Sequence, residues 1–241
     1  MDKLIFIDTE TTGLIPGRHD IIQLAAIIEV KGEVVDKINL KCQPHNWDNI
    51  DDKALEINGI TREELKTFQT PRAAYDKFIV ELGKYVDKWN KNDKLVPVGQ
   101  NIKFDLEHLR EWFKKCDDKE GKFMGSYLDY HSIDLVSMTA LLKLSGKVNP
   151  AKLKLVEVAK YFGFEYDAHD ALSDIEMTRR IFKEYIKIVQ GVSEMSVKKC
   201  DMCRKESGNL YAIPMEFDAY KGKLNICNTC FKVVKDYNPP E

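Results

Sequence analysis

The sequence predicts an α/β protein, in which a sheet carries helices on both faces, followed by a small cysteine-rich module. Three observations predict this architecture. Short β-branched and apolar runs open the chain, segments with helical apolar spacing follow, and two Cys-x-x-Cys motifs stand near the C-terminus. Strands first, with helices interleaved later, are typical of a layered α/β fold. The length of 241 residues suits one large domain or one domain with a small appended module.

Three apolar segments predict the first strands. Residues 4–7 form a short β-branched and aromatic run, which is typical of a buried strand. Residues 19–30 and 34–42 are also apolar, and the sequence Lys-Gly-Glu separates them. A glycine-bearing break of this length predicts a meander of antiparallel strands. Residues 95–98 predict one more short buried strand.

Helical signals dominate the chain from Thr61 onward. Thr61 and Glu64 form a capping box, with the threonine as N-cap and the glutamate at N3. Pro71 is favourable in a first helical turn and predicts a longer helix to residue 89. Asp105 should begin another helix that runs to about residue 115. Apolar spacing predicts further helices at residues 133–144, 153–162 and 169–189, and residues 117–127 form a predicted surface loop.

Composition excludes some classes of protein. The chain is 44% hydrophobic, which is ample for a core, and no uninterrupted apolar run approaches the ~18–20 residues of a membrane span. The N-terminus lacks the pattern of a secretory signal, so we expect a cytoplasmic protein with no membrane partner. The net charge of −2 does not by itself indicate nucleic-acid binding. One cluster of lysines is either a solvated face or a set of phosphate contacts: Lys143, Lys147, Lys152 and Lys154.

An acidic pair follows the first predicted strand. Asp8 and Glu10 are two residues apart, so on a strand their side chains point to the same face. Two carboxylates that share a site repel each other unless a cation lies between them. Hard divalent ions such as Mg²⁺ prefer carboxylate oxygens. The pair therefore predicts a metal site at the end of this strand.

Further motifs extend this site along the chain. Asp105 ends the sequence Asn-Ile-Lys-Phe-Asp, and His169 and Asp174 delimit His-Asp-Ala-Leu-Ser-Asp. With Ile-Asn-Gly-Ile-Thr at residues 57–61, these blocks resemble the DEDDh family of 3′–5′ exonucleases, over about residues 1–190. The resemblance implies a ribonuclease H-like fold with a mixed five-stranded sheet. It also implies an exonuclease domain at residues 1–190, which leaves residues 191–196 as a predicted linker and residues 197–241 as the small cysteine-rich module.

The resemblance also assigns roles in the site. It implies that Asp8, Glu10, Asp105 and Asp174 bind two Mg²⁺ or Mn²⁺ ions, and that His169 is the general base. The spacing of Tyr166 and Asp170 leaves open the sister family, in which a tyrosine replaces the histidine. Gln100 stands where the family often has a histidine. Three nearby acidic residues are interpreted as helix caps or solvent-facing groups: Asp129, Asp134 and Asp170.

Substrate contacts are also predicted from the resemblance. Thr11 and Thr12 can offer backbone or hydroxyl groups to a terminal 3′-hydroxyl. Leu14, Ile60 and Phe104 are expected to stack or wedge against the terminal base, although Ile60 and Phe104 equally fit ordinary core packing. The expected activity is trimming of single-stranded DNA to 5′-mononucleotides, with a replication or repair protein as a possible partner. An exoribonuclease, or a protein that binds nucleic acid without cleaving it, remains the alternative.

The C-terminal segment predicts a second metal site. Two Cys-x-x-Cys motifs are separated by twenty-three residues, close to the spacing of four-cysteine zinc sites. Four thiolates fill a tetrahedral Zn²⁺ site, so the ion would be structural. Disulfides are the competing interpretation, which a cytoplasmic location disfavours. A short helix at residues 231–237 would resemble a treble-clef finger. The predicted zinc ligands are Cys200, Cys203, Cys227 and Cys230.

Overall fold

The computed structural model describes residues 2–117, 124–165 and 170–191, together with the backbone of four short strands between residues 198 and 227. The chain divides into two compact units, Met1–Tyr185 and Ile186–Glu241. The first unit contains the acidic residues of the predicted site. Within the described residues, no helix has the length and apolar character needed to cross a membrane.

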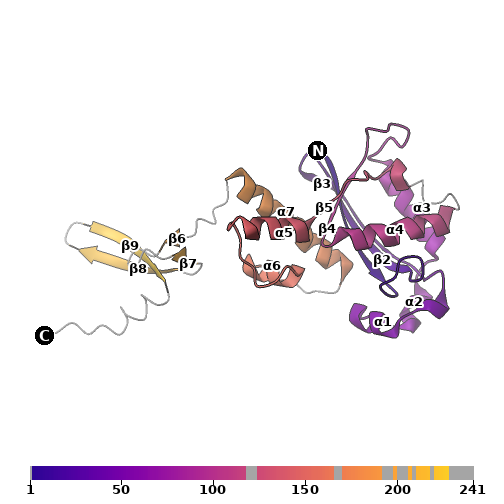
Figure 1. The fold of residues 1–241 in the computed structure, drawn as a ribbon, viewed down its shortest axis with the longest axis horizontal. Coiled ribbons are helices and arrows are strands. Elements are labelled where there is room, and N and C mark those ends of the chain that lie inside the picture. Colours follow the sequence, from indigo (N-terminus) through magenta and orange to yellow (C-terminus); the bar gives the residue numbers. More distant parts are fainter. Residues whose placement is uncertain are drawn as a thin grey trace. The chain divides into compact units, whose positions relative to one another are not determined.

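The first unit is built on a mixed five-stranded sheet (Figure 1). The strand order is β3-β2-β1-β4-β5, with β1 antiparallel to β2 and parallel to β4. The meander predicted for the first three strands is confirmed, because β2 and β3 also pair in antiparallel register. The strands are β1 (Lys3–Thr11), β2 (Ile21–Val30), β3 (Glu33–Lys41), β4 (Val96–Gly99) and β5 (Ile133–Asp134).

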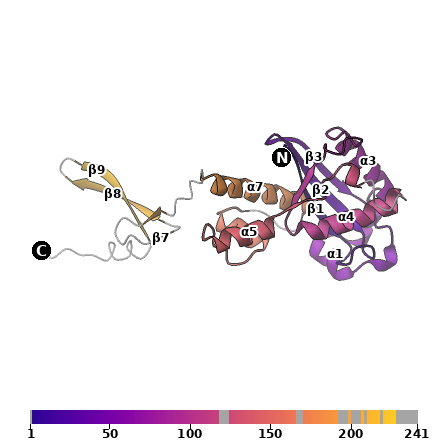
Figure 2. The ribbon, with the colours of Figure 1, turned by 45° about the horizontal axis from the view of Figure 1, so that its top comes forward.

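Helices cover both faces of this sheet. Ile5 and Ile7 of β1 belong to a buried cluster with Phe78 of α3 (Pro71–Gly83) and Phe113 of α4 (Ile102–Asp117). Phe6 points to the other face, where its ring lies 5.5 Å from that of Phe182 in α7 (Ala171–Gln190). Figure 2 shows α4 running across one face of the strands. The remaining helices are α1 (Asp52–Asn58), α2 (Arg62–Thr67), α5 (Leu135–Leu144) and α6 (Leu155–Tyr161), with 3₁₀ turns at Trp47–Asn49 and Met124–Ser126.

Local signals set several boundaries as expected. The capping box at the start of α2 is present, with the Thr61 and Glu64 side chains each accepting from the other residue's backbone N–H. Thr70 caps α3 and Pro71 occupies its first turn. The fold class predicted for the first unit, a mixed five-stranded sheet flanked by helices, is therefore confirmed.

Two boundaries were wrong. The helix expected to reach residue 89 ends at Gly83, where the Lys84 and Tyr85 backbone N–H groups donate three residues back in a tighter turn. The helix expected from residue 133 begins at Leu135. Residues 133 and 134 pair with β4 as a fifth strand, and the Asp134 carboxylate caps the helix that follows.

The second unit contains two strand pairs among its described residues. Strand β6 (Lys198–Lys199) pairs with β7 (Glu206–Ser207), and β8 (Leu210–Phe217) pairs with β9 (Tyr220–Cys227), both in antiparallel register. Cys227 ends β9. The predicted zinc ligands Cys200, Cys203 and Cys230, and the helix expected at residues 231–237, lie outside the described residues.

Candidate active site

Strand geometry brings three carboxylates together at the end of β1. Phe6, Asp8 and Glu10 alternate along the strand, so the two acidic side chains lie on the face that α7 covers. Asp174 lies in the first turn of α7. One carboxylate oxygen from each of Asp8, Glu10 and Asp174 lies within 4.8 Å of the other two. Residues 166 positions apart in the sequence, Asp8 and Asp174, thus share one site.

The electrostatics of this cluster favour a bound cation. Burial, followed by the charges of Asp105, Glu10 and Asp174, raises the pKa of Asp8 well above that of an ordinary aspartate. Burial and the neighbouring carboxylates raise the pKa of Glu10 to about 7. Carboxylates held this close cannot all ionise without a compensating charge. An all-oxygen donor set suits a hard divalent ion, so the residues present fit Mg²⁺ or Mn²⁺.

Asp105 lies beside the cluster and is held by β1. Its Oδ1 accepts a hydrogen bond from the Thr9 backbone N–H at 2.9 Å and another from the Thr9 hydroxyl at 2.8 Å. Burial raises the pKa of Asp105 to about 7, although the two Thr9 hydrogen bonds act in the opposite direction. Asp105 is not one of the three residues whose oxygens converge. Its role as a ligand of a second ion stays a prediction.

The start of α7 is fixed by a residue of β2 that sequence reasoning missed. Asp170 accepts from the Ser173 backbone N–H through Oδ2, at 3.1 Å, and its carbonyl accepts from the Asp174 backbone N–H at 2.9 Å. The Gln23 side chain donates to the other oxygen of Asp170 at 3.2 Å. Gln23 is also the register partner of Glu10. Asp170 is therefore a helix cap, as predicted, and Gln23 links it to the strand beside Glu10.

Buried ion pairs hold the rest of α7 against the sheet. Glu29 of β2 is almost fully buried and receives Arg179 Nε at 2.9 Å and Lys183 Nζ at 2.5 Å. A carboxylate buried on a strand needs such partners, because desolvation alone would make it costly. Gln23 and Glu29 are the polar interruptions of an otherwise apolar strand, and that interruption is the signal that could have identified them.

The loop after β1 leaves Leu14 exposed to solvent. The Asp20 backbone N–H donates to the Thr12 hydroxyl, and the Thr12 backbone N–H donates to the Asp20 carbonyl, both at 2.9 Å. His19 Nδ1 accepts from the Ile15 backbone N–H at 2.9 Å. Gly13 has φ +154°, and a Cβ there would meet the His19 ring at 2.7 Å. The loop is thus closed by its own hydrogen bonds, and Leu14 is 77% exposed at its tip.

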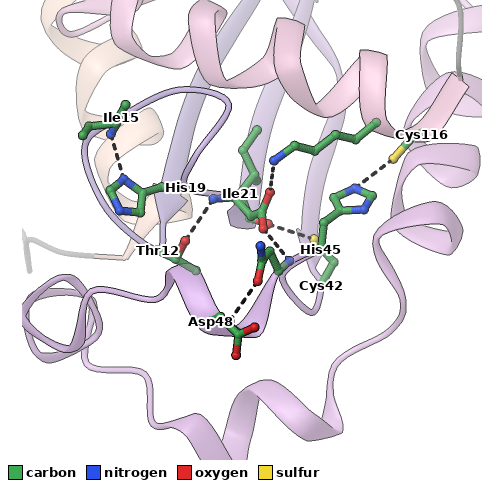
Figure 3. Close-up of polar contacts among 11 residues, drawn as sticks. Thr12, Ile15, His19, Ile21, Cys42, His45, Asp48 and Cys116 are labelled. Carbon is green, nitrogen blue, oxygen red and sulfur yellow. Dashed lines mark hydrogen bonds and ion pairs between the residues drawn. The ribbon is translucent and has the colours of Figure 1, made fainter.

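Asp20 anchors this loop to the rest of the unit. Its buried carboxylate receives Lys115 Nζ from α4 at 2.6 Å and the Asn46 backbone N–H at 2.8 Å. Figure 3 shows the neighbouring group in which the Cys42 thiol donates to the Ile21 carbonyl and Cys116 Sγ lies 3.5 Å from His45 Nε2. Both cysteines are buried thiols, as expected.

Breaking the Asp20–Lys115 pair should destabilise the fold, and the loss should depend on which of the two residues is replaced. Lys115→Met should cost more than Asp20→Asn, because it leaves a carboxylate unpaired whose side chain is 2% exposed. The lysine side chain is 27% exposed and can reach water after the aspartate is neutralised. We expect a loss of about 3–5 kcal/mol for Lys115→Met. Urea unfolding measures the free energy of unfolding of both variants. The control is Lys66→Met, which breaks an exposed ion pair and should stay within about 0.5 kcal/mol of the wild type. A smaller loss for Lys115→Met than for Asp20→Asn would contradict this assignment.

The other predicted substrate residues differ in accessibility. Ile60 is buried in a cluster with Ile22, Leu55 and Leu65, so core packing occupies its side chain. Phe104 is half-buried and its ring centroid lies 4.3 Å from that of His108. The Thr11 hydroxyl donates to the Gly13 carbonyl at 2.7 Å. Of the three predicted apolar contacts, Leu14 is therefore the one most open to a ligand.

The remaining predicted residues fall in two groups. His169 and the alternative base Tyr166 lie outside the described residues. Gln100, at the position where the family often has a histidine, donates through Nε2 to the Leu153 carbonyl at 2.8 Å. Asp134 caps α5, as predicted, and Asp129 accepts from both the backbone and the ring of His131.

Metal-free protein should lose stability as the pH rises through the raised pKa values. Glu10 has its pKa shifted from 4.5 to about 7. Between these values the folded protein keeps a proton that the unfolded chain has released, so the free energy of unfolding falls with rising pH. Ion binding requires the deprotonated carboxylates, so stabilisation by Mn²⁺ should grow over the same range. Thermal unfolding in EDTA and in Mn²⁺, at about pH 5 and about pH 8, measures both trends. Glu10→Gln should show a smaller loss of stability in EDTA and a smaller gain with Mn²⁺. Changes as large as those of the wild type would contradict the raised pKa of Glu10.

Comparisons with known proteins agree with this geometry. The sequence family described as "Exonuclease" matches residues 5–182. The PolC-type DNA polymerase III of Thermotoga maritima is 28% identical over 196 residues, which are 80% of this chain and 12% of the relative. The DNA polymerase III subunit epsilon of Aquifex aeolicus is 29% identical over 189 residues, covering 77% of this chain and 80% of the relative. The chain thus spans only a small part of the PolC-type relatives.

A solved structure shares the fold. The zinc-bound complex of Escherichia coli exonuclease I with single-stranded DNA superposes with a TM-score of 0.65 at 22% identity. The match covers 79% of this chain and 41% of that protein. The two proteins thus share the arrangement of the sheet and its helices, in addition to the sequence-family match over residues 5–182.

Proposed function

Because this chain belongs to the exonuclease family, we propose that it is a metal-dependent 3′–5′ exonuclease. It would trim single-stranded 3′ ends, DNA in preference to RNA, and release 5′-mononucleotides. The observation that carries this proposal is the convergence of carboxylate oxygens from Asp8, Glu10 and Asp174 within 4.8 Å. Such a group binds the divalent ions on which phosphodiester hydrolysis of this type depends.

The residues divide the chemistry among them. Asp8, Glu10 and Asp174 would hold one Mg²⁺ or Mn²⁺ ion, and Asp8 with Asp105 would hold the second, directly or through water. When bound, two such ions activate an attacking water and stabilise charge on the leaving oxygen. His169, the residue before the Asp170 cap, would accept the proton of that water. An imidazole suits this role because its unperturbed pKa of ~6.5 lies near the working pH.

The loop after β1 would position the end of the strand. Leu14 is exposed and stands two residues after Thr12, whose hydroxyl is held by Asp20. An apolar side chain at this place can pack against the terminal base whatever its identity. Thr11 and Thr12 would offer backbone or hydroxyl oxygens to the 3′-hydroxyl, from positions that the hydrogen bonds of the loop hold in place. Phe104, which is half-buried, would stack against the same base, whereas Ile60 is buried in core packing and would contribute less.

The preference for DNA rests on what the similar proteins are. The PolC-type and epsilon relatives are named as parts of DNA polymerase III, and the similar structure of exonuclease I holds single-stranded DNA. A replication or repair protein is accordingly the partner class we propose. Competition between equal amounts of labelled single- and double-stranded DNA and RNA tests the preference. Faster loss of the single-stranded RNA would replace this proposal with an exoribonuclease, and binding without any cleavage would leave only a binding protein.

We also propose one structural Zn²⁺ in the C-terminal unit, bound by Cys200, Cys203, Cys227 and Cys230. The β8–β9 hairpin supports this, because its register pairs Leu210 with Cys227 and so returns the second motif toward the start of β8, a few residues after the first motif. A module with so little chain needs a metal to supplement its core.

Zinc should be measurable as one ion per chain. Cys200→Ser or Cys227→Ser should lose the ion and unfold residues 197–241 locally, because metal binding supplies ~10–16 kcal/mol in small zinc modules. Hydrolysis of short single strands should persist, since the first unit has its own core. Elemental analysis decides the point, with Cys42→Ala, a buried thiol of the first unit, as the control that keeps its zinc. A purified protein that contains no zinc and has two disulfides would refute the proposed zinc site.

A further inference from the structure

A local excess of positive charge stands between the second and third acidic blocks. Residues 141–164 contain five lysines and a single acidic residue, Glu157, in a chain whose net charge is −2. These residues form the end of α5, the α5–α6 loop and α6. One of the lysines organises the loop itself, because Lys143 Nζ donates to the Pro150 carbonyl at 2.6 Å. The others are free to act outside the loop.

Of these lysines, the three that lie between the end of α5 and the start of α6 are exposed and without an ionic partner. Within the part of the chain that the structure describes, Lys147, Lys152 and Lys154 have no carboxylate in ion-pairing distance. Several other lysines of this unit do form such pairs, as Lys37 does with Glu176. Neighbouring cations without ionic partners repel one another, and a bound polyanion would offset this electrostatic repulsion.

A hydrogen bond connects this loop to the end of β4, the strand beside β1. Gln100, the first residue after β4, donates through Nε2 to the Leu153 carbonyl at 2.8 Å. Lys152 and Lys154 flank that carbonyl in the sequence. Gly99 packs so closely on β1 that a Cβ there would lie 2.9 Å from the Ile7 carbonyl oxygen, one residue before Asp8. Lys152 and Lys154 are therefore tied to the end of β4 by the Gln100 hydrogen bond, and β4 pairs with β1, which carries Asp8.

We propose that Lys147, Lys152 and Lys154 bind the phosphate backbone of the single DNA strand whose 3′ end is held at the carboxylate cluster. This inference rests on the proposed function and names the surface that holds the substrate. An acidic centre attracts metal ions but repels the phosphates upstream of the scissile bond, so the enzyme needs cations outside the centre. Lysines act as point charges without reading bases, which suits an enzyme that must accept every sequence.

The test is the salt dependence of binding. Affinity for a single-stranded thymidine oligonucleotide is measured by fluorescence anisotropy over a range of KCl, with Ca²⁺ in place of Mg²⁺ to slow hydrolysis. Each lysine that neutralises one phosphate contributes about 0.7 to the slope of log K against log salt. Lys152→Gln/Lys154→Gln should therefore lower the slope by about 1.4 and weaken binding about 25-fold at roughly 0.1 M salt. Lys147→Gln should lower the slope by about half as much.

A matched control separates this site from general charge effects. Lys91 is exposed and precedes β4, so it lies at the opposite end of that strand from Gly99. Lys91→Gln removes the same charge and should leave the slope unchanged. An unchanged slope in the double variant, or an equal change in Lys91→Gln, would overturn the proposal.

The same variants distinguish this inference from the proposed function. Bis(p-nitrophenyl) phosphate has no upstream strand, so the double variant should hydrolyse it with Mn²⁺ at the wild-type rate. A wild-type protein that hydrolyses neither this ester nor oligonucleotides would refute the proposed activity, while the salt slopes would still decide whether these lysines bind the strand. If the double variant has the wild-type salt slope and the wild-type rate of oligonucleotide hydrolysis, only the lysine site is refuted.

Discussion

Replacing Asp8, Glu10 or Asp174 by alanine is expected to remove nearly all hydrolysis, by about 10³-fold or more, equivalent to roughly 4 kcal/mol of transition-state stabilisation. The three carboxylates supply the oxygens that converge within 4.8 Å, so the loss of one leaves a metal ion short of both charge and ligands. Asp105→Ala is expected to be similarly inactive if Asp105 serves the second ion. Initial rates on a labelled single strand with saturating Mg²⁺ measure these losses.

Unfolding would not explain such a loss. The pKa of Asp8 is raised by burial and by the charges of its acidic neighbours, so removing Asp8 relieves repulsion in the metal-free protein. We expect Asp8→Ala to melt in EDTA at a temperature equal to or above that of the wild type. Asp129→Ala, at an acidic residue bonded to His131 and outside the cluster, is the matched control and should keep full activity. Wild-type rates in any cluster variant would refute the role assigned to that residue.

The second large effect separates two candidate general bases. His169→Ala should lose about 10²–10⁴-fold in turnover, the usual contribution of a general base, while metal binding persists because the carboxylates remain. Tyr166→Phe should be nearly silent. The control is to titrate Mn²⁺ by calorimetry into both variants, which should bind it like the wild type.

The pH dependence gives an independent readout. Loss of the imidazole should remove the limb of the rate profile that reports its titration, whereas loss of the Tyr166 hydroxyl should leave that profile unchanged. The opposite ranking of the two variants, in rate and in pH profile, would place this chain in the tyrosine-using branch.

The acidic site was predictable because its signals are local. The i, i+2 spacing of Asp8 and Glu10 on a strand fixes their common face, and the structure confirms that they meet. The capping box at Thr61 and the proline at the start of α3 were likewise visible in a few consecutive residues. The expected identity of Asp170 as a helix cap also held, because a cap depends on the next helical turn.

Other features depend on partners far away in the sequence. Glu29 and Arg179 are separated by 150 residues, and neither residue alone indicates the other. Gln23 likewise has its role only through its hydrogen bond to Asp170, 147 residues later. Strand β5 was missed because it has only 2 residues and runs directly into a helix. The exposure of Leu14 and the burial of Ile60 also follow from tertiary packing, which spacing does not encode.

The most direct test of the account is digestion of a 5′-end-labelled single-stranded oligonucleotide with Mg²⁺, with EDTA and with the Asp8→Ala variant. A metal-dependent 3′–5′ exonuclease should give a ladder that shortens from the 3′ end, with 5′-mononucleotides as the released product. EDTA and Asp8→Ala should both abolish that ladder. Immediate release of the labelled nucleotide, cuts within the strand, or degradation that continues in EDTA would contradict the account.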